Sequence, residues 1–318
     1  MPRLLTLNSH EGYLYELART GYPMDVIVGL PGHHHPTWDE RLRPVPDNVR
    51  LISLEEATRS SYACVIGHSV TDLLTVKTIV GARILVLHSS LAGRIAQEKS
   101  TVTPAEMSAL VRRYIDAIGG TVVIISEMKR RTWQLPRARV IVNAVSGEDY
   151  HGYTGDIPSG LRVANHVHLK ERYLMWSLHE AVFDELPCRV VGVNPQLPDA
   201  APSRDWADLK ALYRQHRFYV HTASEELEDG YNLGLLEAMA TGMPVVTNDH
   251  ASSPVRDGVE GFRSNDAATL KRGARRLLED PALAQKMGMA ARARALELFP
   301  VDGFVSAWRA LIEEVTSG

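Results

Sequence analysis

The sequence has little cysteine. Only Cys64 and Cys188 occur in 318 residues, and both stand in apolar, strand-like surroundings, YACVIG and LPCRVVG. Two cysteines in so long a chain cannot form a disulfide framework. We expect both to be buried thiols with no part in catalysis.

Long apolar runs are also missing. The longest apolar pieces, such as TVVIIS, have the size of a strand and fall well short of the ~18 residues that span a bilayer. Near the amino end, the apolar stretch Leu4–Leu7 is too short for the core of a secretory signal. We therefore expect a cytoplasmic protein without a membrane span, for which peripheral membrane contact stays open.

An excess of charge of one sign is lacking as well. The 35 Lys and Arg residues against 38 Asp and Glu residues give a net charge of −3. No field over the whole surface therefore attracts nucleic acid, which we do not expect as a partner, and any anion site has to be local. Apolar residues make up 45% of the chain, and its 23 Gly and 17 Pro are scattered, which excludes disordered and low-complexity classes.

What the sequence does have is an alternation of short apolar runs with helix-like stretches. LLTL, DVIVGL, ACVIG and RILVLH follow one another in the first half, and the alternation starts again with LRVANHV. This pattern predicts two α/β domains, each with a doubly wound parallel sheet. The chain length agrees at ~100–200 residues per domain, and two domains imply a cleft between them.

The polar segment GEDYHGYTGDIPS separates the two halves and is rich in Gly and Pro, as linkers are. We predict an amino-terminal Rossmann-like domain over residues 1–146, a linker over 147–159 and a second Rossmann-like domain over 160–300. The spacing of apolar residues in 301–318 predicts a final amphipathic helix.

One carboxylate is isolated in an apolar helix. Between Gly230 and Asn248 the only charged residue is Glu237, which falls inside the predicted helix Leu233–Thr241. Gly242 follows as the expected helix end. Burying a lone carboxylate costs roughly several kcal/mol unless it is paired or hydrogen-bonded. Glu237 therefore needs a partner, which is either a protein Arg or backbone amide, or a pair of ligand hydroxyls.

The start of that helix predicts a second part of a site. We expect Asn232 to be the N-cap, and the free amides near Leu233 favour an anion. Gly230 allows the backbone to approach a ligand closely. Asp229 belongs to an acidic loop just before it. Carboxylates beside such a helix start suggest a ligand with both phosphate and sugar-like hydroxyls, as in a nucleotide sugar.

The run EDGYNLGLLEAMATGMPVV resembles the signature of the retaining glycosyltransferases of family 4, which have the GT-B fold. Their motif is a Glu, seven residues and a second Glu, followed by Ala-Met-Ala, a Gly and Pro-Val-Val. The resemblance implies that Glu237 contacts the ribose hydroxyls, and that the amides near Asn232 and Leu233 hold the pyrophosphate. Asp229 stands at the first Glu, which contacts sugar hydroxyls. Because Asp is about one methylene shorter, either the donor sugar is placed differently or Glu228 takes that role.

Other segments resemble the same family. VIVNAVSGEDY, RVVGVNP, SSPVRDGVEGFRSND and PALAQKMGMAARARALELFPVDGFVSAW match its characteristic stretches, most clearly over Leu161 to Trp308. The resemblance implies that the last helix, within 301–318, packs back on the first domain.

The resemblance also assigns residues outside the motif. Cations for the pyrophosphate are expected after the first strand of the second domain, where Lys170 is the first choice and Arg172 the second, although either can equally be a solvated loop charge. His88 ends the strand RILVLH, where the family often has a histidine that contacts the donor sugar. Gly12 follows the first strand, where the family has a Gly-containing loop under the donor phosphates. His68 matches no motif and is interpreted as a structural histidine.

The consecutive histidines His33, His34 and His35 invite a metal interpretation. Neighbouring residues of an extended chain point to opposite sides, so three in a row do not face one ion. No other His, Cys or Asp spacing completes a site. We expect no metal and no bound cofactor, because the nucleotide sugar is a co-substrate and the family needs no catalytic metal.

Together with the site residues, the resemblance implies a retaining, metal-independent GT-B glycosyltransferase. It moves a sugar from a nucleotide-diphosphate sugar to an unidentified acceptor, a glycan, a lipid or a small molecule, with Asp229, His88 and Lys170 as the catalytic residues. Two alternatives stay open: a GT-B sugar-nucleotide epimerase, and a catalytically silent GT-B subunit that binds a nucleotide or a partner. The sequence gives neither the base and sugar of the donor nor the oligomeric state.

Overall fold

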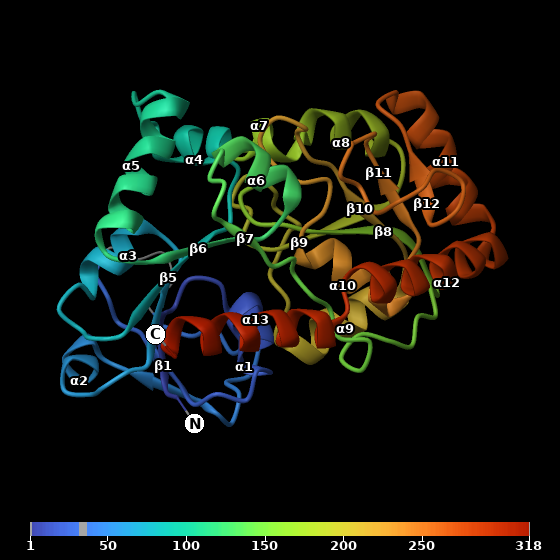
Figure 1. The fold of residues 1–318 in the computed structure, drawn as a ribbon. Coiled ribbons are helices and arrows are strands. Elements are labelled where there is room, and N and C mark those ends of the chain that lie inside the picture. The colour runs from blue at the N-terminus through green and yellow to red at the C-terminus, as the bar shows by residue number, and fades with distance from the viewer. Residues whose placement is uncertain (1, 32–36, 318) are drawn as a thin grey trace. The chain divides into compact units, whose positions relative to one another are not determined.

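The computed structural model describes residues 2–31 and 37–317. The chain forms two compact units. Unit 1 consists of two segments, one that ends at Asn143 and one that begins at Val301, and unit 2 extends from Ala144 to Pro300. Figure 1 shows that each unit is a sheet with helices packed on its faces. Two parallel α/β units confirm the predicted fold class.

Unit 1 contains a parallel sheet in the order β3-β2-β1-β4-β5-β6-β7. Its strands are β1 (Leu4–Leu7), β2 (Met24–Ile27), β3 (Val49–Ile52), β4 (Cys64–Gly67), β5 (Ala82–Leu87), β6 (Thr121–Ile124) and β7 (Arg139–Val140). The chain order reverses between β1 and β4. In open parallel sheets, ligands bind at the carboxyl ends of the strands near such a reversal.

The helices of unit 1 cover the apolar strands of this sheet. They are α1 (Glu11–Ala18), α2 (Leu54–Thr58), α3 (Val70–Thr75), α4 (Leu91–Glu98), α5 (Pro104–Ala117), α6 (Glu127–Trp133) and α13 (Val301–Thr316). Central strands β1 and β4 are buried along their whole length, as expected for mainly apolar strands in the middle of a parallel sheet. Cys64, on β4, is one of these buried residues, as predicted, whereas Cys188 in unit 2 is only partly buried.

The last helix, α13, packs against α1, β4 and β5 within unit 1. Its apolar side, which includes Phe304 and Trp308, is buried. Both of these rings contact Tyr13 of α1 edge-on. In addition, the Arg309 Nε donates a hydrogen bond to the Thr20 carbonyl oxygen at 2.9 Å.

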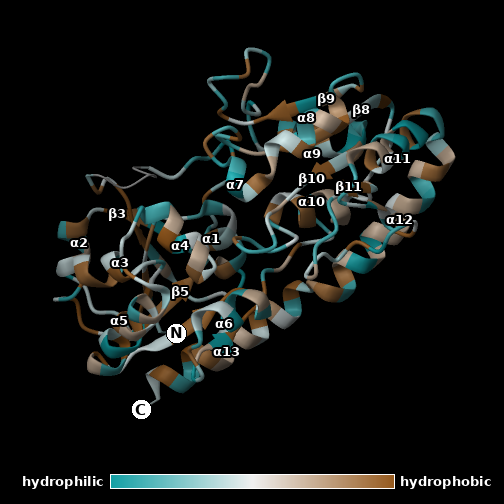
Figure 2. Cartoon of the chain, turned by 90° about the horizontal axis from the view of Figure 1, so that it is seen from above, coloured by the Kyte–Doolittle hydropathy of each residue, from teal (hydrophilic) through white to brown (hydrophobic). Residues whose placement is uncertain are grey.

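Unit 2 contains a parallel sheet in the order β12-β11-β10-β8-β9. Its strands are β8 (Ile157–Val163), β9 (Cys188–Val191), β10 (His216–His221), β11 (Val245–Thr247) and β12 (Gly261–Arg263). Its helices are α7 (Glu171–Leu174), α8 (Trp176–Phe183), α9 (Trp206–Gln215), α10 (Leu233–Thr241), α11 (Ala267–Glu279) and α12 (Pro281–Leu298). Figure 2 shows α11, α12 and α13 banded in hydrophilic and hydrophobic colour, as expected for helices with one buried side.

Two predicted element bounds in unit 2 are wrong. The predicted linker 147–159 extends three residues too far, because β8 already begins at Ile157. A shift of register against β10 between His216 and Phe218 accommodates Pro158 and Ser159. A bulge of this kind lets a central strand contain a proline, which cannot donate to the ladder. The composition that indicates a linker therefore belongs in part to a strand.

The alternation of strands and helices in the second half also predicts a single helix near Glu171 to Leu186, and this prediction is the second to be corrected. The structure has two helices there, α7 and α8, because Met175 adopts a left-handed conformation with φ 48° and ψ 55°. The carbonyl oxygen of Leu174 accepts hydrogen bonds from the Arg162 guanidinium and the Thr222 hydroxyl. In a continuous helix this carbonyl would accept a hydrogen bond from a backbone amide of the next turn, and here the two side chains replace that donor.

Along the described residues, every helix is too short or too polar to pass through a lipid bilayer.

Candidate functional site

Helix α10 begins where the sequence predicts. Asn232 has an extended backbone, and its side chain accepts a hydrogen bond from the Leu235 amide at 2.9 Å. The helix ends at Gly242, whose φ of 104° is the left-handed conformation that favours glycine. Because α10 connects the parallel strands β10 and β11, its amino end lies at the carboxyl edge of the sheet, where its first amides attract an anion.

Glu237 is buried in the middle of α10, with 6% of its surface exposed. Its Oε2 accepts a hydrogen bond from the Tyr213 hydroxyl of α9 at 3.0 Å. Burial and the Glu237 carboxylate raise the pKa of Tyr213 well above its usual value, so the phenol remains a donor. Glu237 thus has a protein partner, as expected, and this phenol is a partner that the sequence did not suggest.

Two glycines near the helix start are required by protein packing. A Cβ at Gly230 would lie 2.8 Å from His250 Nδ1, and a Cβ at Gly234 would lie 2.8 Å from the Tyr219 hydroxyl. The Gly230 amide donates to Ser252 Oγ at 2.9 Å. Packing against His250 thus explains why position 230 is a glycine, in addition to the close approach of a ligand that the sequence suggests.

Asp229 is buried, with 2% of its surface exposed, in the loop between β10 and α10. The loop is held by His250, whose Nε2 pairs with the Glu228 carbonyl oxygen at 3.0 Å. The Nδ1 of the same ring accepts a hydrogen bond from the Ser252 amide at 3.1 Å. Sequence reasoning missed His250, because its contacts join segments 22 residues apart.

The predicted cations lie close to this loop. Lys170 precedes α7 and Arg172 belongs to it, and both side chains are exposed. Partial desolvation of its ammonium lowers the pKa of Lys170, and the nearby Glu228 carboxylate opposes that shift. The Ser224 amide donates to the Tyr173 carbonyl oxygen at 2.9 Å, which holds α7 beside the loop after β10. The structure therefore brings Lys170 and the acidic loop of unit 2 together.

A buried cation lies beneath these residues and was missed by sequence reasoning. Arg162 of β8 has 2% of its surface exposed, and its Nη2 donates to the Leu174 carbonyl oxygen at 2.8 Å. Its guanidinium carbon lies 5.4 Å from the centre of the Trp176 ring. Burial lowers the pKa of Arg162 to about 10, so it stays charged at neutral pH. Arg162 holds the end of α7, which follows Lys170 and Arg172.

In unit 1, His88 stands directly after β5, at the carboxyl edge of the sheet. Its Nε2 lies 2.8 Å from Nδ1 of His68, which directly follows β4. Nε2 of His68 lies 3.0 Å from the Thr6 hydroxyl of β1. The structure thus connects His68, interpreted from the sequence as a structural histidine because it matches no motif, directly to the predicted His88. In the sequence, the only sign of this contact is that each of the two histidines directly follows a predicted strand.

The sequence predicted that Gly12 lies in a loop, and this prediction is wrong. Helix α1 already begins at Glu11, so Gly12 belongs to its first turn. His10 is the extended residue before the helix, and a Glu11 oxygen accepts from the Asn8 side chain at 3.1 Å. An acidic residue in the first turn favours an early helix start. The turn after β1 is therefore shorter than expected, and its polar groups are Asn8, His10 and Glu11.

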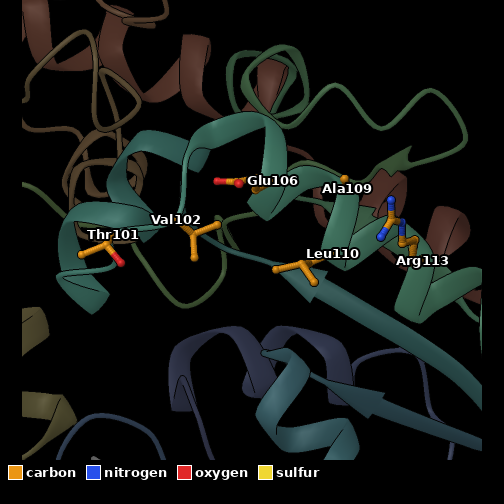
Figure 3. A pocket seen from close by; sticks show the side chains of 6 residues that line it. All are labelled: Thr101, Val102, Glu106, Ala109, Leu110 and Arg113. Carbon is orange, nitrogen blue, oxygen red and sulfur yellow. The ribbon is translucent and has the colours of Figure 1, made fainter.

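An open pocket of about 470 Å³ in unit 1 contains none of the predicted site residues. Figure 3 shows its lining side chains, which come from α5 and the segment before it: Thr101, Val102, Glu106, Ala109, Leu110 and Arg113. Residues His33, His34 and His35 lie outside the described part of the chain. Within residues 2–31 and 37–317, no group of three or more His, Cys, Asp or Glu could hold a metal ion.

Residues 190–280 match a protein-family model described as glycosyl transferases group 1. The matched stretch contains the loop with Asp229 and all of α10. No curated protein matches the sequence.

Solved structures resemble the whole chain at low sequence identity. HepE of Anabaena, in complex with UDP and glucose, has a TM-score of 0.71 at 14% identity, covering 99% of this chain and 100% of that one. Sucrose-phosphate synthase from Thermosynechococcus elongatus has a TM-score of 0.68 at 15% identity and covers 100% of both chains. A glycosyltransferase from Rickettsia africae has a TM-score of 0.69 at 13% identity, covering 99% of this chain and 98% of that one. The chain has the GT-B fold.

Proposed function

We propose that the protein is a retaining glycosyltransferase that moves a sugar from a nucleotide-diphosphate sugar to an acceptor hydroxyl. The observation that carries this proposal is the buried Glu237 in the Asn232-capped helix α10. This helix lies inside the stretch that matches the group 1 glycosyl transferases. A carboxylate suits paired ribose hydroxyls, and the capped amino end suits a diphosphate.

In the proposed reaction, the bond between the anomeric carbon and the diphosphate oxygen breaks. The acceptor oxygen bonds that carbon from the same face, and the acceptor proton leaves with the diphosphate. The amides near Leu233, with Lys170 first and Arg172 second, stabilise the charge that develops on the leaving group. Asp229 and His88 are proposed to hydrogen-bond the transferred sugar.

The proposal needs neither a resident cofactor nor a metal, since helix amides and lysine offset the diphosphate charge. Transfer is therefore expected to continue at full rate in the presence of EDTA. A loss of transfer in EDTA that added Mg²⁺ or Mn²⁺ restores would show that a metal ion takes part of this role.

The donor is identified by a thermal-shift screen with UDP, GDP, dTDP and ADP sugars, because a ligand that binds only the folded state raises the melting temperature. Structures of HepE contain UDP-glucose, which makes UDP sugars the first to test. We expect one base to raise the melting temperature clearly more than the others. If none raises it, the proposed nucleotide site is wrong.

The reaction itself is tested by NMR of the products formed from the identified donor with a panel of acceptors. We expect a glycoside with the anomeric configuration of the donor, together with free nucleoside diphosphate. An isomerised nucleotide sugar would instead indicate an epimerase. Tight donor binding with no consumption across the panel would indicate a catalytically silent subunit.

A further inference from the structure

A chain of hydrogen bonds crosses three neighbouring strands of unit 1 and ends on His88. It runs from Thr6 on β1 through His68 after β4 to His88 after β5, with distances of 3.0 and 2.8 Å. The chain lies at the carboxyl edge, where the strand order reverses between β1 and β4. This is the edge where ligands bind in open parallel sheets.

The chemistry of this chain restricts the protonation of both rings. A bond between two imidazole nitrogens needs one N–H and one lone pair. If the Thr6 hydroxyl donates to His68, then His68 donates to His88, and Nδ1 of His88 carries a proton. If His68 donates to Thr6, then His88 donates to His68, and Nδ1 of His88 carries a lone pair. Both arrangements are electrically neutral, and they differ in whether His88 donates or accepts at Nδ1.

The surroundings also favour neutral rings. His68 is buried, and burial lowers its pKa to about 4. Burial lowers the pKa of His88 well below its usual value. The nearby side chains of His10, His68 and Lys129 lower it further, because positive charge on them would repel a protonated His88 ring. An acidic group, Asp72 of α3, accepts from the His68 backbone amide at 2.8 Å. The aromatic contact from α1 is Tyr13, whose ring centre lies 4.8 Å from that of His88.

As a whole residue, His88 is only partly buried. Among the described residues, its hydrogen bonds engage Nε2 alone. The ring of the exposed His10 lies next to it, with centres 4.6 Å apart. A pair of histidines that serves only the core would not leave one ring at the edge of the sheet with Nδ1 unengaged.

We propose that His68 is a positioning residue that holds the His88 ring through Nε2 and presents Nδ1 of His88 to a neutral hydroxyl group. A hydroxyl both donates and accepts, so it matches Nδ1 in either arrangement of the chain. That this hydroxyl belongs to the transferred sugar rests on the proposed function. The orientation of His88 by His68 does not.

The hydrogen bond is tested directly by NMR of the full chain with ¹⁵N-labelled histidine. We expect a scalar coupling across the N–H···N bond between His68 and His88 at pH 7, and ring shifts of two neutral imidazoles. Substitution of His68 by Phe should move the ring shifts of His88, because Nε2 loses its partner. Absence of the coupling in the wild type, or unchanged His88 shifts in folded His68→Phe, would overturn the proposal.

The positioning role is tested by kinetics on the same variants. His68→Phe should lower kcat by ~10-fold with little change in the KM of the donor, because His88 is misoriented while the nucleotide is still bound. His68→Asn, which returns a polar group near the position of Nδ1, should recover part of the loss. His179→Phe, a buried histidine of unit 2, is the matched control and should keep kcat.

The outcomes separate this proposal from the proposed function. An unchanged kcat in a His68→Phe variant that melts like the wild type would overturn the positioning role. If the wild-type chain consumed no nucleotide sugar at all, the proposed function would fail. The coupling and the His88 shifts would still decide whether His68 holds His88.

Discussion

The candidate sites of the two units are assembled in different ways. In unit 2, Asp229, Asn232 and Glu237 come from one loop and the helix that follows it. In unit 1, Thr6 and His68 are 62 residues apart and His68 and His88 are 20 residues apart, and the sheet brings them together. A site built along the chain leaves a motif in the sequence. A site built across strands leaves only isolated polar residues at strand ends.

The two sites also differ in charge. Unit 2 offers helix amides, Lys170 and buried carboxylates, a set suited to an anion and to hydroxyls. Unit 1 offers a chain of neutral imidazoles, which suits an uncharged group. Changes in unit 2 should therefore alter nucleotide affinity or the charge-dependent step, whereas changes along the histidine chain should alter kcat alone.

The largest expected effect comes from Asp229, which separates catalysis from nucleotide binding within unit 2. If Asp229 has the proposed role at the transferred sugar, Asp229→Asn should lower kcat by ~100-fold through loss of its negative charge, while nucleoside diphosphate affinity stays nearly constant. Steady-state kinetics and calorimetry measure both. Glu226→Gln, which changes an exposed carboxylate of the same loop, is the control. A fully active Asp229→Asn enzyme would move this role to another residue, with Glu228 the first to test.

Lys170 tests whether unit 2 recognises charge. Lys170→Met should weaken binding of the nucleoside diphosphate by ~10-fold and of the nucleoside monophosphate less, because fewer phosphate oxygens need a cation. Calorimetric titration with both ligands measures the difference. Lys286→Met, an exposed lysine on α12, should leave both affinities unchanged. Equal losses for the two ligands would show that Lys170 does not contact the terminal phosphate.

Sequence reasoning predicted the α10 region well because its signals are local. The Asn232 cap, the end at Gly242 and the buried Glu237 all follow from neighbours along the chain. It could not predict Tyr213 as the partner of Glu237, because that contact depends on how α9 packs against α10. The fold class was predictable in the same local way, from the alternation of strands and helices.

The errors have a common cause. Pro158 and Ser159 indicate a linker by composition, yet pairing with β10 makes them part of β8. The break at Met175 depends on Arg162, which is distant in sequence and provides a partner for the Leu174 carbonyl. In each case a tertiary contact overrides a local preference. The connection of His68 to His88 was missed for the same reason.

A smaller effect is expected from the hydrogen bond between Tyr213 and Glu237. Tyr213→Phe should lower the free energy of unfolding by ~1–2 kcal/mol, because a buried carboxylate loses a donor. Urea unfolding measures it, with Tyr114→Phe in unit 1 as the control. No loss of stability would show that other partners of Glu237 suffice to hold its carboxylate.

The smallest effect concerns acid stability and buried histidines. The pKa of His179 is lowered by burial to about 2 in the folded state, against the usual 6.5. Only the unfolded state therefore takes up this proton below pH 6.5, and stability falls as the pH drops. When the pH is lowered from 7 to 5.5, the free energy of unfolding of His179→Phe should therefore fall by ~1 kcal/mol less than that of the wild type. Urea unfolding at both pH values measures this, and an identical loss in both proteins would contradict it.

The central claim is that α10 of unit 2 holds the nucleotide through Glu237. Its most direct test is calorimetric titration of the wild type and Glu237→Gln with the nucleoside diphosphate identified by the screen, on variants whose melting temperatures confirm folding. Loss of the carboxylate charge should weaken binding by at least ~10-fold, because charge-assisted hydrogen bonds to the ribose are lost. Unchanged affinity in the folded variant would contradict the claim.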